Sequence, residues 1–329
     1  MSHSPSTSTT TDAVAADAVA RPSRVAPQRR RHNLTTRRQH RAAYLFILPF
    51  FAIFLTMLVV PLVYAGYLSL FESRLIGGEQ FAGLANYARA FADPSFWGGL
   101  GRVALFLLIQ VPIMLGLALF FALALDTGRA RGSRSIRLLI FMPYAVPAVI
   151  ATLMWGYLYG PDFGPLAQVA RGVGWGTPDF LSPGNILGSM MNIVTWEFIG
   201  YNMIIMYAAL RAIPAELYEA AEIEGAGQFR IAWSIKIPSI RPAILLTVIF
   251  SVIGSFQLFN EPSLLNAIAP DAITNSFTPN YYAYNLAFIN RELNYAAAIA
   301  FLLGLVIAVV SYAVQLGEQR REQRERKGL

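Results

Sequence analysis

Six long apolar stretches constrain the fold of this chain more than any other feature of its sequence. A helix crosses the hydrocarbon core of a bilayer with about 20 residues, because each residue adds ~1.5 Å. The approximate stretches that fit this length are Tyr44–Leu70, Val103–Leu125, Leu138–Leu158, Met190–Leu210, Ala243–Phe259 and Tyr295–Leu316. The chain is 55% hydrophobic and only 14% charged. The sequence therefore predicts an all-α membrane protein with six transmembrane helices.

The basic residues indicate which side of the membrane each loop faces, because Lys and Arg collect in cytoplasmic loops. If both termini are cytoplasmic, most of the 26 basic residues lie inside. In the opposite orientation, the only basic residues on the cytoplasmic side would be Arg74, Arg89, Arg102, Arg171 and Arg291. We therefore expect an N-in, C-in protein. Its net charge of +7 then reflects membrane topology, and we expect no nucleic-acid partner.

The residue types that the spans lack exclude several kinds of chemistry. The chain has no Cys, so it can form no disulfide, thiolate nucleophile or Cys-ligated metal site. Its three His residues, His3, His32 and His40, all precede the first span. The sequence also lacks a G-x-S-x-G motif, so an enzyme within the membrane would have neither a nucleophile nor a base. We expect no catalytic site, no metal and no cofactor.

A polar segment between the fourth and fifth spans, EAAEIEGAGQFRIAWSIKIP over 219–238, predicts two short helices joined by a glycine turn. Pro214 suits the first turn of a helix, and Glu219 suits its positive end. Gly225 allows a left-handed exit from that helix. The second helix should stop at Ile237–Pro238, because a residue before proline is disfavoured in the α region. An amphipathic pair lying on the membrane surface without a partner would have the same composition.

The order of residues in this segment resembles the EAA loop of the membrane subunits of ABC importers: Glu-Ala-Ala, three residues, Gly, nine residues, Ile-x-Leu-Pro. The matching residues are Glu219, Ala220, Ala221, Gly225, Ile235, Ile237 and Pro238. Two departures are mild, since Ile237 stands where the family prefers Leu and Glu224 stands where Asp is common. The flanking IPAELYEAAEIEGA and PSIRPAI resemble the carbohydrate-uptake branch, which contains maltose and glycerol-phosphate permeases.

This resemblance implies a type I ABC importer permease fold in the bacterial cytoplasmic (inner) membrane. The EAA loop, residues 211–242, would be cytoplasmic, and Glu219–Gly225 would enter a cleft of an ATPase and couple its closure to transport. The implied partners are a second permease subunit, forming a heterodimer with this chain, a cytoplasmic ATPase homodimer and an extracellular sugar-binding protein. The chain has no G-x-x-x-x-G-K-[ST] loop, so ATP hydrolysis belongs to the separate ATPase subunit.

Two further elements are similar to family patterns and also have plain structural explanations. Gly83, Asn86 and Tyr87 match a Gly-x-x-Asn-Tyr element, while Pro143, Pro147 and Trp155 match an FxPxxxP…W pattern. A loop with a short amphipathic helix would explain the first group. Proline kinks and interfacial Trp residues are ordinary in membrane helices and would explain the second. The resemblance covers about residues 40–318.

Composition divides the chain into three parts. Residues 1–43 are rich in Ser, Thr and Ala and then in Arg, so we expect a disordered basic cytoplasmic tail. Residues 44–316 form the transmembrane permease domain, and residues 317–329 form a basic cytoplasmic C-terminal tail. Arg29-Arg30-Arg31 resembles a twin-arginine export signal. However, the apolar stretch after it is long, contains Pro61 and has no small-residue cleavage site.

Two groups of polar residues within the spans predict a substrate path. Glu197 and Tyr201 lie four residues apart on one helix face, with Trp196 adjacent, and a mid-membrane charge costs about 2.5–3.5 kcal/mol unless it faces a cavity or partner. Gln257, Asn260 and Glu261 share a second face. Amide and carboxylate groups beside aromatic rings suit sugar hydroxyls and apolar sugar faces. Alternatively, Glu261 could stand in external water and Glu197 could pair with the second subunit.

The absence of Lys and Arg inside the spans, with Arg102 at an edge, disfavours anionic substrates. We therefore expect a neutral di- or oligosaccharide, with a cationic small solute as the alternative. FQLFNEPSLL and TNSFTPNYYAY resemble permeases of cello-oligosaccharide or β-glucoside importers. A secondary active transporter is a further alternative, but it would not explain the EAA segment, and the two halves show no evident internal repeat.

Overall fold

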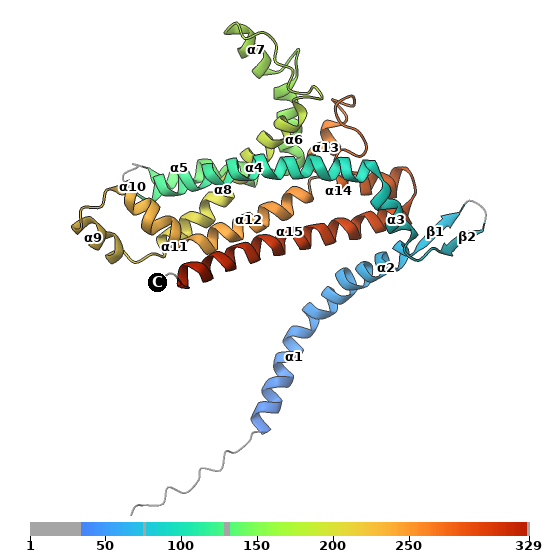
Figure 1. The fold of residues 1–329 in the computed structure, drawn as a ribbon, viewed down its shortest axis with the longest axis horizontal. Helices are drawn as coiled ribbons and strands as arrows, with labels where there is room; N and C mark the ends of the chain where they lie inside the picture. The colour runs from blue at the N-terminus through green and yellow to red at the C-terminus, as the bar shows by residue number, and fades with distance from the viewer. Residues whose placement is uncertain (1–33, 75–76, 128–131, 328–329) are drawn as a thin grey trace, which may run out of the picture. The chain divides into compact units, whose positions relative to one another are not determined.

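The computed structural model describes residues 34–74, 77–127 and 132–327, with the side chains of residues 44–74, 77–127 and 132–320. Most of these residues are helical (Figure 1). The chain forms two units, residues 1–58 and 59–329, which are described separately. In the first unit, α1 (Leu34–Phe54) contains Pro49. The π-helical turn η1 (Leu55–Val59) follows it, and its last residue is the first of the second unit.

In the described part of the second unit, the regular secondary structure is helical apart from one β-hairpin. Its helices are α2 (Val60–Ser69), α3 (Ala85–Ala92), α4 (Pro94–Asp126), α5 (Ser133–Phe141), η2 (Met142–Ala145), α6 (Ala148–Tyr159), α7 (Pro165–Gly172), α8 (Ile186–Arg211), α9 (Glu216–Ile223), α10 (Gln228–Ile231), η3 (Ala232–Lys236), α11 (Ile237–Ser239), α12 (Arg241–Phe256), α13 (Asn260–Leu265), α14 (Pro279–Tyr284), η4 (Asn285–Ile289) and α15 (Leu293–Lys327). The hairpin pairs β1 (Phe71–Arg74) with β2 (Gly78–Phe81) in antiparallel fashion, with Phe71 opposite Phe81.

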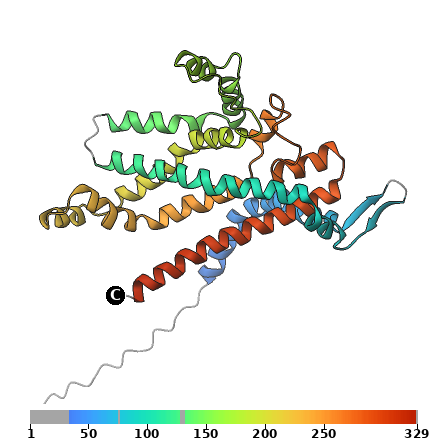
Figure 2. The same cartoon turned by 45° about the horizontal axis from the view of Figure 1, so that its top comes forward.

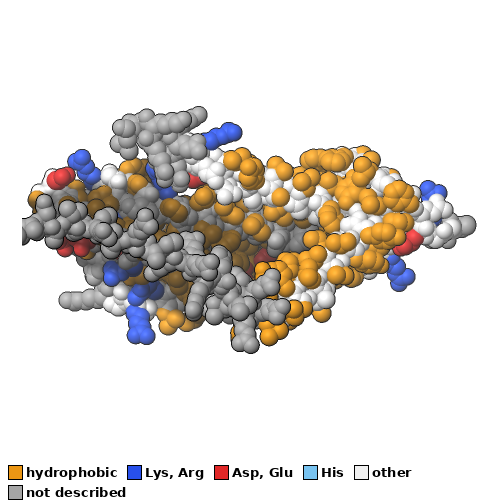
Figure 3. Space-filling model, turned by 90° about the horizontal axis from the view of Figure 1, so that it is seen from below, with side chains coloured by type: hydrophobic (Ala, Val, Ile, Leu, Met, Phe, Trp, Pro, Cys, Tyr) orange, Lys and Arg blue, Asp and Glu red, His pale blue; other side chains and the backbone are white. Residues whose placement is uncertain are grey.

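The described helices agree with the predicted spans, with one exception. The segments long and apolar enough to cross a bilayer are Tyr44–Ser69, Pro94–Asp126, Ile186–Arg211, Arg241–Leu265 and Leu293–Arg320. On α4, Leu108, Ile113 and Phe120 are apolar and exposed, as expected of a surface that faces lipid. In the space-filling view, hydrophobic side chains predominate over much of the visible surface, while Lys and Arg lie mainly toward its edges (Figure 3).

The exception is the third predicted span, Leu138–Leu158, which is not one straight helix. The segments Ser133–Ala145 and Ala148–Tyr159 meet at an angle of 95°, and together they would make the sixth span (Figure 1). Val146, between them, has an extended backbone with φ −80° and ψ 129°. Pro147 causes this break, because its ring pushes the preceding residue out of the α region and its nitrogen donates no hydrogen bond.

Helices α4 and α8 pack along each other at the centre of the second unit, and α12 lies beside them (Figure 2). Their shared core contains small and flexible side chains, which allow close helix packing in a membrane. The buried members are Val111, Met114, Leu115, Ala118, Ala122 and Leu125 from α4, and Met203, Met206 and Leu210 from α8, together with Ile240. These contacts join the second half of α4 to the last third of α8.

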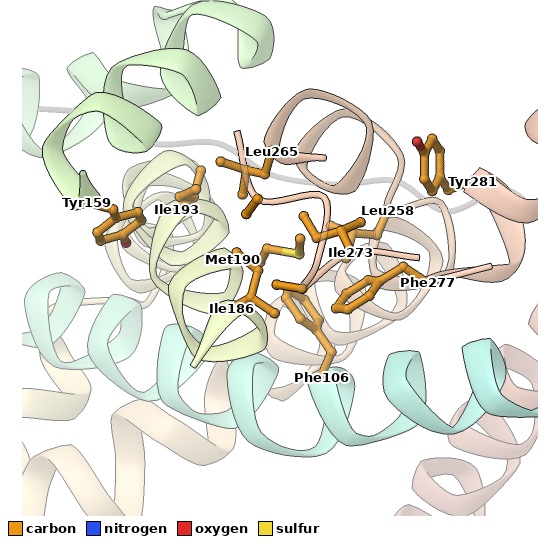
Figure 4. Close-up of a cluster of buried hydrophobic side chains, with 12 residues drawn as sticks. Phe106, Tyr159, Ile186, Met190, Ile193, Leu258, Leu265, Ile273, Phe277 and Tyr281 are labelled. Carbon is orange, nitrogen blue, oxygen red and sulfur yellow. The ribbon is translucent and has the colours of Figure 1, made fainter. Parts of the chain in front are cut away.

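A second core joins the start of α8 to α4 and to the segment after α12. Phe106 from α4 meets Ile186 and Met190 from α8, and Leu258 and Phe277 close the cluster (Figure 4). This core fixes the point at which α12 ends and the chain continues as a non-helical segment. It therefore supports the polar residues of that segment.

Asp93 fixes the start of α4 by accepting a hydrogen bond from the Ser95 backbone N–H at 2.8 Å. The hydroxyls of Tyr282 and Tyr295 donate to its other oxygen, each at 2.7 Å. Burial acts to raise the pKa of Asp93, but the hydrogen bonds from Tyr295, Tyr282 and backbone N–H groups outweigh burial. The pKa therefore lies below its ordinary value of 3.8. The carboxylate ties α3, α4, α14 and α15 together at one end of the bundle.

The ends of the chain extend the terminal helices beyond the predicted limits. Helix α1 begins at Leu34, inside the predicted tail of residues 1–43, and residues 1–33 lie outside the described residues. Helix α15 continues to Lys327, so most of the predicted C-terminal tail, 317–329, prolongs the last span. The stretch GEQRREQRERK is rich in Glu, Gln and Arg, which have high helix propensity, and this favours continuation of the helix past the apolar stretch.

Candidate functional site

The segment that resembles an EAA loop forms the predicted helix and glycine turn. Helix α9 spans Glu216–Ile223, and Gly225 follows with a left-handed φ of +81°. The Gly225 N–H donates to Glu222 O at 3.0 Å, and the Ala226 N–H donates to Ala221 O at 2.9 Å. These two bonds form a Schellman motif, which satisfies carbonyls at the end of the helix. The prediction of a left-handed exit at Gly225 is confirmed.

The predicted end of the second helix at Ile237–Pro238 is wrong. Helix α10 passes into the π-helical turn η3 and then into α11, so the helical path continues to Ser239. Pro238 lies in the first turn of α11, where its missing N–H costs little. In the preceding π-helical turn η3, the Ile237 N–H donates to Ala232 O. This wider turn makes room for the ring of Pro238, so the helical path is not interrupted there.

One face of this loop is anchored to the bundle, and the other face is exposed. Ile231 and Ile240 are buried, while the motif residues Ile235, Ile237 and Pro238 are partly buried. Glu219 and Ala220 of the motif are exposed, and Ala221 is half-buried. Four apolar side chains of the loop are also exposed, by between 49% and 87%: Leu217, Ile223, Phe229 and Trp233. The rings of Phe229 and Trp233 stack with their centres 6.5 Å apart.

The anchored side of the loop contains a buried ion pair between Lys236 and Asp126 that the sequence did not predict. The ring of Tyr218, on α9, lies 4.9 Å from the Lys236 ammonium. Burial raises the pKa of the Tyr218 hydroxyl, and the nearby Asp126 carboxylate adds to this effect, while Arg211 opposes it. Lys236 was predictable only as a cytoplasmic basic residue, because its partner stands 110 positions away in the sequence.

All five predicted substrate-path residues line one cavity of about 370 Å³ within the bundle. Glu197 and Tyr201 reach it from α8, while Gln257, Asn260 and Glu261 reach it from the junction of α12 and α13. The two predicted polar groups, which come from different spans, therefore meet in space. The cavity brings carboxyl, amide and hydroxyl groups together in one partly open volume.

A break in the fifth span exposes backbone and side chains to this cavity. Helix α12 ends at Phe256 and α13 begins at Asn260, so the three residues between them are not helical. The freed carbonyls are satisfied from the segment around the start of α14. The Thr278 hydroxyl donates to Leu258 O at 2.9 Å, and the Asn280 amide donates to Gln257 O at 3.0 Å. Non-helical backbone is tolerated in a membrane when it lines a cavity in this way.

Both cavity carboxylates are buried. Glu197 is 3% exposed and Glu261 is 6% exposed. One oxygen of Glu197 has no hydrogen-bond partner within the described part of the chain. The burial of Glu261 argues against the alternative that it stands in external water. Pairing of Glu197 with a second subunit stays an open alternative.

Aromatic rings form part of the cavity wall. Tyr144 from η2 stacks on Tyr201 with ring centres 4.8 Å apart, and both line the cavity. Phe250 and Phe259 line it from the fifth span. Trp196, expected to flank Glu197, packs edge-on against Trp155 at 5.8 Å and does not line this cavity. Adjacent residues on a helix point about 100° apart, so Trp196 cannot share the direction of Glu197.

Other residues of the site were missed from the sequence. Gln110 of α4 and Asn202 of α8 add amide groups to the cavity, and Gln110 donates to the Thr195 hydroxyl at 3.2 Å. A polar residue in the middle of a predicted span was the available signal for Gln110.

Gly200 lets α5 approach α8, because a Cβ there would collide with the backbone of Ile140. No sequence signal separates this glycine from the others.

Apolar side chains make up most of the cavity lining, and a few polar groups stand among them. Among its described lining residues there are two carboxylates and neither Lys nor Arg. An anionic solute would therefore find no compensating cation among these residues, while hydroxyl or ammonium donors would find acceptors. The cavity thus combines hydrogen-bonding groups with aromatic rings, as sites for small polar solutes commonly do.

Comparisons with known proteins identify the family. Residues 114–323 match the family described as binding-protein-dependent transport system inner membrane component. The chain belongs to this family. Every predicted residue of the loop and the cavity falls within the matched range.

Relatives in this family include sugar permeases. The lactose transport system permease protein LacF of Rhizobium radiobacter is 31% identical over 82% of this chain and 91% of its own length. The diacetylchitobiose uptake system permease protein NgcF of Streptomyces coelicolor is 30% identical over 80% of this chain and 78% of its own length. A chain of a bacterial ABC transporter involved in the import of the acidic polysaccharide alginate has the same fold, with a TM-score of 0.76 and 18% identity, over 86% of this chain and 96% of that one.

Proposed function

We propose that this chain is a membrane-spanning permease subunit of an ATP-driven importer and that a neutral di- or oligosaccharide passes through its cavity. The observation that carries the proposal is the meeting of Glu197, Tyr201, Gln257, Asn260 and Glu261 in one partly open cavity, where the two Glu side chains are buried and Gln257 and Asn260 are exposed. Sugar hydroxyls need acceptors and donors at several points, and sugar faces pack on aromatic rings such as Tyr144 and Phe259. The names of the lactose and diacetylchitobiose permeases support this substrate class.

The same proposal assigns partners to the chain's two sides. The exposed face around Glu219, Ala220 and Gly225 contacts a separate cytoplasmic ATPase, which hydrolyses the ATP. A second permease subunit completes the pathway, and an extracellular binding protein delivers the sugar. A related alginate transporter has been solved in complex with a sugar-bound periplasmic protein, which supports this arrangement. Both termini and the EAA loop then face the cytoplasm.

Uptake measurements on cavity variants test the substrate class. In cells with matched amounts of the complex, Asn260→Ala should remove hydrogen bonds worth about 0.5–1.5 kcal/mol each, or roughly two- to twelvefold in uptake. Glu197→Gln should be tolerated better than Glu197→Ala, because an amide still bonds to hydroxyls. Glu79→Gln, at an exposed position in β2, is the matched control and should leave uptake unchanged.

A cationic small solute is the second candidate, favoured by the two buried carboxylates and the absence of a cation among the described lining residues. If the solute is cationic, Glu197→Gln should damage uptake nearly as much as Glu197→Ala, because the charge itself would be recognised. Unchanged uptake in both Glu197 variants and in Asn260→Ala would remove these residues from the pathway.

A further inference from the structure

A buried ion pair links the EAA loop to the end of α4. The Lys236 ammonium lies 2.5 Å from an Asp126 carboxylate oxygen, and the two side chains are 7% and 5% exposed. Lys236 is the last residue of η3, and Asp126 is the last residue of α4. The pair therefore joins the proposed ATPase-contacting loop to one of the spans that line the cavity.

The surroundings of the pair restrain its geometry. Tyr218 from α9 covers the Lys236 ammonium at 4.9 Å. A cavity of about 410 Å³ lies beside the pair, and Arg211, Glu222 and Gln228 also line it. Lys236 is thus held by a carboxylate from α4 and by a ring from α9, the helix that begins the loop.

Helix α4 connects this pair to the substrate cavity. It runs unbroken from Pro94 to Asp126, through Pro112, and contributes Gln110 and Met114 to the cavity lining. A displacement of its Asp126 end would therefore be carried along the helix to the cavity. Ile240 also attaches the loop, by apolar contact with the core between α4 and α8, so the ion pair is not its sole attachment.

A buried ion pair contributes little net stability, since two well-packed apolar residues often serve as well. What distinguishes the ion pair is its fixed geometry. The ammonium and the carboxylate must stay at hydrogen-bonding distance and angle, whereas apolar contacts are non-directional. A linkage that must transmit movement without slipping gains from this property. The loss of one partner would leave an uncompensated buried charge.

We propose that Asp126 and Lys236 are positioning residues that transmit movement of the EAA loop to α4 and thereby to the cavity. This inference rests on the proposed function, because it requires an ATPase that moves the loop. When the ATPase shifts α9, Lys236 moves with the loop and holds the end of α4 to it. Neither residue touches the sugar.

The test uses the complete complex, purified through a tag on this chain and reconstituted with its binding protein. The quantity measured is sugar uptake per ATP hydrolysed, with thermal stability in parallel. Asp126→Asn and Lys236→Met should each lower this ratio by about tenfold or more, because each leaves one buried charge unpaired. Glu292→Gln, in the exposed ion pair between Arg89 and Glu292, is the matched control and should leave the ratio unchanged.

A double variant separates coupling from folding. Asp126→Leu combined with Lys236→Met removes both charges and should restore thermal stability, yet uptake per ATP should stay low. If this double variant recovers the wild-type ratio, the pair only anchors the loop and the inference is overturned. Wild-type ratios in the single variants would overturn it as well. A wild-type complex without ATP-dependent uptake would instead refute the proposed function.

Discussion

The left-handed turn at Gly225 gives the sharpest prediction about the EAA loop. Its φ is +81°, and a Cβ built there meets no atom within 4 Å. A substitution at Gly225 therefore acts through backbone strain and not through a clash. An L-residue in this conformation costs roughly 1–2 kcal/mol, and a β-branched residue tolerates it worst. Gly225→Val should thus disfavour the Schellman turn and displace α9.

The magnitude follows from this strain. One or two kcal/mol changes an equilibrium by about five- to thirtyfold, so ATP hydrolysis stimulated by the loaded binding protein should fall by that factor in the reconstituted complex. Gly225→Asn should lose clearly less, because Asn adopts the left-handed region more readily. Gly227→Val is the matched control, since Gly227 has φ −71° and is equally free of neighbours.

The assay compares stimulated ATP hydrolysis and sugar uptake for these variants at equal complex abundance. The reasoning requires the order wild type, Gly225→Asn, Gly225→Val, with Gly227→Val close to wild type. Normal stimulation by the Gly225→Val complex would refute the claim that this turn positions an ATPase contact. An amphipathic pair that lies on the membrane without a partner would give that result.

Two further predictions concern packing and topology. Gly200→Ala should lower the thermal stability of the complex by an overpacking cost of about 1–3 kcal/mol, because the new Cβ collides with the backbone of α5. Gly188→Ala is the control on the same helix and should leave the thermal stability unchanged, because its new Cβ would meet open space. Single cysteines can be placed in this cysteine-free chain without background labelling. A cysteine at Asn275 should react with an impermeant thiol reagent from outside intact cells, and one at Gly227 should not.

The spans and the EAA turn were predictable because each follows from a strong local rule. A bilayer demands a minimum apolar length, and Gly225 is suited to a left-handed exit. The cavity residues were predictable for a related reason, since a polar side chain such as Glu197 within a span needs a polar partner or cavity. Their meeting in one volume depends on helix packing, which the sequence alone does not specify.

The features that the sequence did not predict depend on distant residues or on competing local rules. Pro147 was visible, yet proline can kink a span or break it, and only the packing of α5 and α6 decides between these outcomes. The same ambiguity produced the wrong end at Pro238. The pairing of Asp126 with Lys236 joins residues far apart in the sequence, so no local pattern reveals it.

ATP-dependent uptake into proteoliposomes tests the central claim most directly. The complex, purified through this chain, is reconstituted with the binding protein outside and ATP inside, and labelled lactose, cellobiose and cellotriose are supplied in turn. The account predicts accumulation of a neutral sugar that requires internal ATP and persists when ion gradients are collapsed. Accumulation driven by an ion gradient without ATP would contradict the account and identify a secondary transporter.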